Sequence, residues 1–158
     1  MSRMEKDYKV RASHCDYRAT EDEIYNALKQ TTDPLDRSWK KLEKAKKVVL
    51  KLNMIKKPEA IAYFKGRRRE LVDDAVARAV LRLLRERTTA ELIATDTFPY
   101  GNGFITPEDF NYRHILDEFG VQYVDSNLPP FTEYTVPGGG SMFDTYILNQ
   151  VFEEADEV

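Results

Sequence analysis

The sequence has a single cysteine, Cys15, and only two histidines, His14 and His114. One cysteine cannot form a disulfide within the chain, and a lone cysteine beside ordinary core composition is typical of a reducing compartment. These thiol and imidazole groups are too few for a four-ligand structural zinc site. We therefore expect a cytoplasmic or otherwise intracellular protein that binds no metal.

Long apolar runs are also missing. No run reaches the roughly 18 residues that a membrane-spanning helix needs. The first residues, Met1 to Arg11, alternate in charge, so we expect neither a signal peptide nor a membrane partner. Hydrophobic residues make up 42% of the 158 residues and charged residues 32%, which is enough apolar material for one domain with its own core.

Positive charge is almost absent from the last third of the chain. Residues 88–158 hold 1 Lys/Arg and 13 Asp/Glu, whereas residues 37–87 hold 17 Lys/Arg and 6 Asp/Glu. Three interpretations stay open. The acidic third folds against the basic block, the two surfaces pair between copies, or the basic block binds nucleic acid. Chance differences between solvated helix faces are a fourth.

Hydrophobic periodicity predicts a mainly α protein with a helical-bundle body. A capping box at Thr20 and Glu23 starts one helix, and Pro34 follows its end. The strongest helix signal lies at residues 71–84, where apolar pairs recur four apart. Spacings of three and four predict a second helix at residues 36–54. Shorter helices are expected at 58–65 and near 92–94.

The character of the sequence changes near Thr95, beyond which most of the glycines and prolines lie. A helix is expected from Thr106 to a stop at Gly120, and another from Ser141. Residues 121–124 and 131–136 are expected to be short extended segments or a small two-stranded element. The chain thus divides into an irregular lead-in (1–19), a basic helical body (20–94) and an acidic Gly/Pro-rich C-terminal region or arm (95–158).

No group of residues predicts catalysis, a cofactor or a small-molecule substrate. Residues 102–110 resemble the second half of an EF-hand loop, but Phe98 and Tyr100 stand where that family needs oxygen ligands, so calcium binding is not expected. The run Gly138-Gly139-Gly140 precedes an expected helix but lacks the lysine of a phosphate-binding loop. It is interpreted as a hinge.

The basic stretch around residues 56–69 is the best candidate for binding nucleic acid or an acidic partner. Its aromatic residues could stack on unpaired bases while its cations neutralise phosphates. The alternative is that the aromatic residues anchor a core and the cations stay solvated. The candidate contacts are Lys56, Lys57, Tyr63, Phe64, Lys65, Arg67, Arg68 and Arg69.

The function expected first is that of a non-catalytic structural subunit, a homo- or hetero-oligomer whose C-terminal arm contacts neighbouring proteins. In outline it is similar to the helical adaptor and connector proteins of tailed-virus particles, although no motif carries that likeness. Cutting the chain after Pro130 should then leave the body folded. The alternative is a nucleic-acid-binding helical module that uses residues 40–69. The candidate arm contacts are Phe131, Tyr134, Phe143 and Tyr146.

Overall fold

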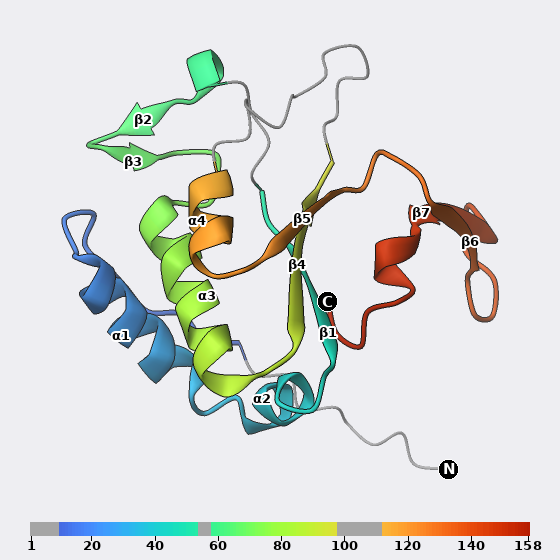
Figure 1. Cartoon of the computed structure of the whole chain (residues 1–158), viewed down its shortest axis with the longest axis horizontal. Coiled ribbons are helices and arrows are strands. Elements are labelled where there is room, and N and C mark those ends of the chain that lie inside the picture. The colour runs from blue at the N-terminus through green and yellow to red at the C-terminus, as the bar shows by residue number, and fades with distance from the viewer. Residues whose placement is uncertain (1–9, 54–57, 98–111) are drawn as a thin grey trace.

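The computed structural model describes residues 10–53, 58–97 and 112–158 as a mixed α/β fold (Figure 1). A three-stranded parallel sheet forms its centre, and two small antiparallel hairpins lie outside that sheet. The predicted mainly α fold with a helical-bundle body is therefore wrong. The helices are α1 (Glu21–Thr32), α2 (Asp36–Leu42), α3 (Asp74–Arg87) and α4 (Arg113–Glu118), with 3-10 turns at Pro58–Ala60 and Gln150–Phe152. The strands are β1 (Lys47–Lys51), β2 (Tyr63–Phe64), β3 (Arg67–Arg68), β4 (Glu91–Asp96), β5 (Gln122–Asp125), β6 (Phe131–Thr135) and β7 (Thr145–Asn149).

The parallel sheet has the strand order β1-β4-β5. Helix α3 connects β1 to β4, and α4 connects β4 to β5, as parallel strands require long crossover connections. Helix α1 packs against α3 and forms an outer layer (Figure 1). Strand β4 pairs with β1 on one side and with β5 on the other. The sheet therefore contains strands from both the predicted body and the predicted C-terminal region.

Both faces of the sheet are covered. On the helical side, Val48 joins the main core with Leu81. On the opposite face, Val49 and Ile93 pack against Val151 from the segment that follows β7. Adjacent residues of a strand point to opposite faces, which is why Val48 and Val49 enter different clusters. The last residues of the chain therefore form part of the core.

The helix predicted at residues 36–54 is wrong beyond its first two turns. Helix α2 ends at Leu42, and β1 follows after a short turn. The valines of β1 are buried on both faces, and near-continuous apolar runs of this kind are typical of parallel strands. The same cause makes β4 a strand where a short helix near 92–94 was predicted.

The helix expected from Thr20 is confirmed as α1. The Thr20 hydroxyl accepts a hydrogen bond from the Glu23 N–H at 3.3 Å, and the Glu23 carboxylate accepts one from the Thr20 N–H at 2.8 Å. These are the two bonds of the predicted capping box. The strong helix signal at residues 71–84 is confirmed as α3.

The helix predicted between Thr106 and Gly120 is represented by α4, while its predicted start lies outside the described residues. Gly120 has φ +60° and ends the helix as expected, because glycine adopts this conformation without strain. The segments expected to be extended are confirmed as β5 and β6. They pair with β4 and β7 rather than with each other.

The helix predicted from Ser141 is wrong, because this segment forms β7 and a 3-10 turn. Strand β7 is rich in β-branched and aromatic residues, which favour strands. The helix predicted at 58–65 is reduced to one 3-10 turn followed by β2. Lys65 and Gly66 connect β2 to β3 with φ of +50° and +82°, as a two-residue hairpin turn requires. Among the described residues, no helix is long and apolar enough to cross a membrane.

Candidate functional site

The β2–β3 hairpin carries most of the predicted basic contacts. Tyr63 and Phe64 are each 57% exposed, so neither ring anchors the core. This exposure removes the alternative in which both rings are core anchors. The candidate contacts Lys56 and Lys57 lie outside the described residues.

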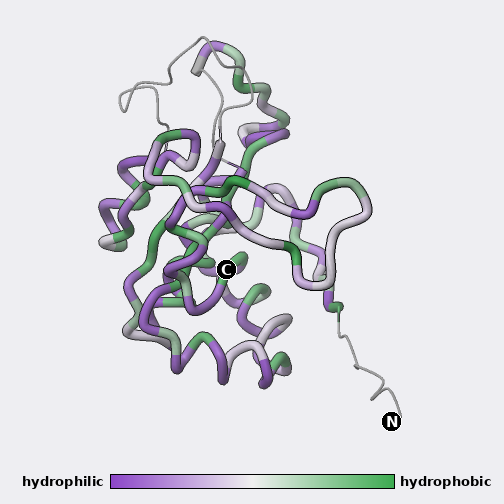
Figure 2. The backbone as a smooth tube through the Cα atoms, turned by 90° about the vertical axis from the view of Figure 1, so that its right-hand side faces the viewer, coloured by the Kyte–Doolittle hydropathy of each residue, from purple (hydrophilic) through white to green (hydrophobic). Residues whose placement is uncertain are grey.

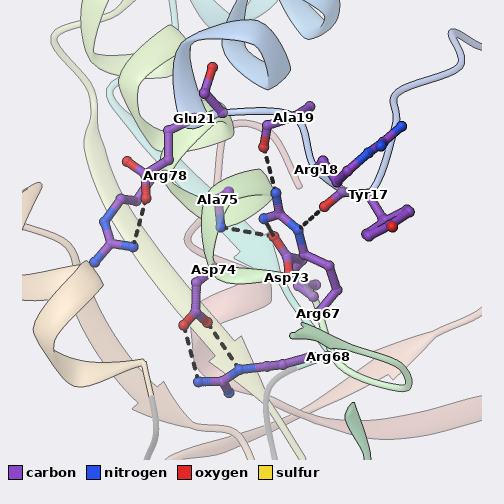
Figure 3. A network of polar contacts seen from close by, with 12 residues as sticks. Tyr17, Arg18, Ala19, Glu21, Arg67, Arg68, Asp73, Asp74, Ala75 and Arg78 are labelled. Carbon is purple, nitrogen blue, oxygen red and sulfur yellow. Dashed lines mark hydrogen bonds and ion pairs between the residues drawn. The ribbon is translucent and has the colours of Figure 1, made fainter. Parts of the chain in front are cut away.

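Arg67 holds the hairpin to the body of the protein (Figure 3). Its guanidinium donates hydrogen bonds to the backbone carbonyls of Tyr17 at 2.8 Å and Ala19 at 2.6 Å, and to the Asp73 carboxylate at 2.9 Å. Asp73 in turn accepts a hydrogen bond from the Ala75 N–H and caps α3. Arg67 thus joins the N-terminal segment, the hairpin and the start of α3.

Arg68 also contributes to the folded structure. Its side chain is only 8% exposed and forms an ion pair with Asp74 at 3.1 Å. The guanidinium carbon lies 4.6 Å from the centre of the Tyr112 ring, a cation–π arrangement. Burial raises the pKa of Tyr112 to about 12, so its hydroxyl stays protonated and donates to the Val72 carbonyl.

Arg69 and Lys65 remain on the surface. The Lys65 ammonium lies 4.3 Å from the centre of the Tyr17 ring and 5.4 Å from that of Phe64. Beside it is an open pocket of about 540 Å³. We call it the arginine pocket, and it is lined by Tyr17, Phe64, Arg67, Arg68 and Arg69.

We expect Arg67→Ala to lower the free energy of unfolding by about 2 kcal/mol, because it removes a partly buried ion pair and two charge-assisted hydrogen bonds. Arg69→Ala is the matched control and should change it by less than about 0.5 kcal/mol, since its exposed side chain lacks an ion pair to any described residue. Urea unfolding of both variants measures the difference. Equal losses would contradict the assignment of a structural role to Arg67 and not to Arg69.

The β6–β7 hairpin is the second candidate surface. Phe131, Tyr134, Phe143 and Tyr146, the four candidate arm contacts, are between 47% and 57% exposed. The rings of Phe143 and Tyr146 meet edge to face at 6.1 Å. Figure 2, which views the molecule from the side of this hairpin, shows hydrophobic positions distributed along it.

Both faces of the β6–β7 hairpin carry exposed apolar side chains. Tyr134 is opposite Tyr146 on one face, and Glu133 is opposite Ile147 on the other. The hairpin is attached to the body at its base, where the Asn149 side chain donates to the Leu128 carbonyl at 2.7 Å. The glycine run at 138–140 belongs to the connection between β6 and β7 and precedes no helix.

Polar residues also meet at the carboxyl edge of the parallel sheet, the usual ligand site in open α/β folds. Asp96 is 3% exposed, and its carboxylate pairs with the Lys51 ammonium at 2.7 Å. This pair was not predicted from the sequence, although Lys51 directly follows one apolar run and Asp96 follows another by one residue. In the part of the chain that the structure describes, no group of His, Cys, Asp and Glu is arranged to hold a metal ion.

Within one copy, ion pairs bring the basic block of the sequence into contact with its acidic third. They support the interpretation in which the acidic third folds against the basic block. Among the described residues, five pairs join these two regions: Lys41–Glu157, Lys47–Glu91, Lys47–Glu154, Lys51–Asp96 and Arg78–Glu118. Three more join the basic block to the N-terminal segment: Arg78–Glu21, Arg82–Asp22 and Arg87–Asp33.

Comparisons with protein-family models, with curated proteins and with solved structures gave no match to this chain. The segment that resembles half of an EF-hand loop, residues 102–110, lies outside the described residues. The two hairpins and the sheet edge are therefore the features of this protein that bear on its function.

Proposed function

We propose that this protein is a non-catalytic structural subunit of a larger assembly and that it contacts its neighbour through the β6–β7 hairpin. The observation that carries this proposal is the exposure of large apolar side chains on both faces of the hairpin. Ile147 on one face is 72% exposed, and Tyr134 on the other face is 50% exposed. Exposed apolar patches of this kind mark interaction sites on proteins.

The stability of the hairpin gives a second argument. A two-stranded hairpin without further packing is only marginally stable in water. Strands β6 and β7 pair with each other and with no other described strand, so both outer edges offer unpaired backbone groups. A partner that covers one face or extends one edge would stabilise the hairpin.

Nucleic-acid binding through residues 40–69 has less support. Arg67 and Arg68 are engaged by Asp73 and Asp74, which reduces the positive charge available to phosphates. The Lys65 ammonium already lies against the Phe64 ring, one of the two rings on which bases would stack. The exposed ring of Tyr63 is the feature that keeps this alternative open.

Site-specific photo-crosslinking tests the proposal. We expect a benzoylphenylalanine in place of Ile147, which is 72% exposed, to crosslink to another protein molecule in cells that make this protein from its own gene. The same residue in place of Val76, which is 39% exposed on α3, is the control and should give no such product. Mass spectrometry identifies the crosslinked chain. Absence of a product at position 147 would contradict the proposal.

A further inference from the structure

The two hairpins carry complementary surfaces. One face of β6–β7 presents Phe131, Glu133 and Ile147, because Glu133 is opposite Ile147 and Phe131 lies two residues away on the same strand. We call this the acidic–apolar face. Residues 126–150 contain two carboxylates, Glu133 and Asp144, and no Lys or Arg. A partner surface that places cations next to apolar side chains would complement this face.

The arginine pocket offers such a surface. Residues 61–69 contain four cations and no carboxylate. The Phe64 ring and Arg69 both line the pocket, so an apolar wall lies beside a cation that pairs with no carboxylate of the described residues. Its volume of about 540 Å³ has room for an aliphatic side chain such as that of Ile147. An anchor residue that fills a pocket beside a charged pair is the usual centre of a protein interface.

The two surfaces of one copy are too far apart to meet. In Figure 1 the β2–β3 hairpin and the β6–β7 hairpin lie on opposite sides of the parallel sheet. The acidic–apolar face must therefore meet the pocket of another molecule. Two different patches of one chain that fit each other give a heterologous contact, which repeats into a ring or a filament.

We propose that the acidic–apolar face of one copy docks on the arginine pocket of a second copy, with Ile147 in the pocket and Glu133 next to Arg69. This inference rests on the proposed function and names the partner as a second copy of this chain. Opposite charges at such a contact set its orientation and make it sensitive to salt.

Charge reversal at each side tests the contact by sedimentation of the purified chain, from micromolar to millimolar concentration, at low and high salt. Arg69→Glu and Glu133→Lys should each weaken self-association at least about tenfold, since each places like charges together. An equimolar mixture of the two variants should regain it, because the lysine introduced at position 133 of one variant then meets the glutamate introduced at position 69 of the other. Lys40→Glu, at an exposed position on α2, is the control for net charge and should have no effect.

Three results would overturn the contact. If the mixture stays dissociated while the wild-type chain associates, the two patches do not meet. If Arg69→Glu weakens only the binding of a labelled single-stranded oligonucleotide, the pocket is a nucleic-acid site. If the wild-type chain is monomeric throughout, its partner is not a second copy. A crosslink from position 147 to a different protein would then preserve the proposed function, whereas no crosslink would remove both.

Discussion

A chain that lacks residues 150–158 is expected to lose most of its stability. Val151 is 7% exposed and covers Val49 and Ile93, which are 0% and 4% exposed. Each of these three side chains contributes about 1.5–3 kcal/mol when buried, so the loss should reach about 4.5–9 kcal/mol. That is comparable with the whole stability of a typical domain. Urea unfolding and near-UV circular dichroism measure the loss.

Polar contacts increase this expected loss. The Val49 N–H donates to the Glu157 carbonyl at 2.9 Å. The Asp156 carboxylate accepts the backbone N–H groups of Lys47 at 2.9 Å and Lys46 at 2.7 Å, and these bonds lower its pKa. The substitution Ile147→Ser, on the exposed hairpin, is the control and should leave stability nearly unchanged. A shortened chain that unfolds at the same urea concentration as the full chain would show that these residues do not belong to the core.

The same reasoning changes the expectation for a cut after Pro130. The arm interpretation predicts that the remaining body folds. A cut there also removes Val151 and the backbone bonds to β1, so we now expect the remainder to be unfolded or molten. The part of the C-terminal region that is free to act as an arm is the β6–β7 hairpin alone.

Replacing Arg85 by Met is expected to lower the free energy of unfolding by about 3 kcal/mol. The guanidinium donates hydrogen bonds to the carbonyls of Phe119 at 2.9 Å, Ala90 at 3.0 Å and Gly120 at 2.8 Å. These carbonyls precede β4 and β5, so one side chain on α3 fixes the entry of both strands into the sheet. Losing the donors leaves the partly buried carbonyls of Phe119 and Ala90 unsatisfied. Hydrogen bonds to charged groups are worth about 1.5–3 kcal/mol each before such losses overlap.

Arg82→Met provides the matched control on the same helix. Arg82 is 47% exposed, pairs with Asp22 and Glu86, and lies over the Tyr25 ring. Exposed contacts of these kinds contribute about 1 kcal/mol or less. Thermal unfolding of the two variants compares them directly. Equal effects at positions 82 and 85 would mean that the carbonyl contacts of Arg85 contribute nothing beyond an ordinary surface pair.

The helices could be predicted where local signals determine them. The capping box at Thr20 and the repeated apolar pairs of α3 act within a few residues, and both helices form as expected. Strands β1 and β4 could not be predicted in the same way. Their apolar runs are short, and a short apolar run fits a buried helix segment as well as a strand. What determines the strand is the second layer over the sheet, which comes from residues 150–157.

The residues of the candidate site could be named from the sequence, but their arrangement and separate roles could not. The exposed aromatic residues of both hairpins were named from the sequence. The separate roles of Arg67, Arg68 and Arg69 were not, because three identical neighbours carry no local signal for which one meets a carboxylate. Asp73 and Asp74 select the first two only after the hairpin folds back on the start of α3.

The parallel pairing of β1 with the chain near Glu157 has a consequence for the rate of folding. It joins segments that lie far apart along the chain, and contacts of such high sequence separation slow folding because the long loop must close first. During synthesis, β1 and β4 emerge long before the segment that covers Val49 and Ile93. The nascent chain therefore exposes one apolar face of its sheet for much of its synthesis, a state that favours aggregation or chaperone binding.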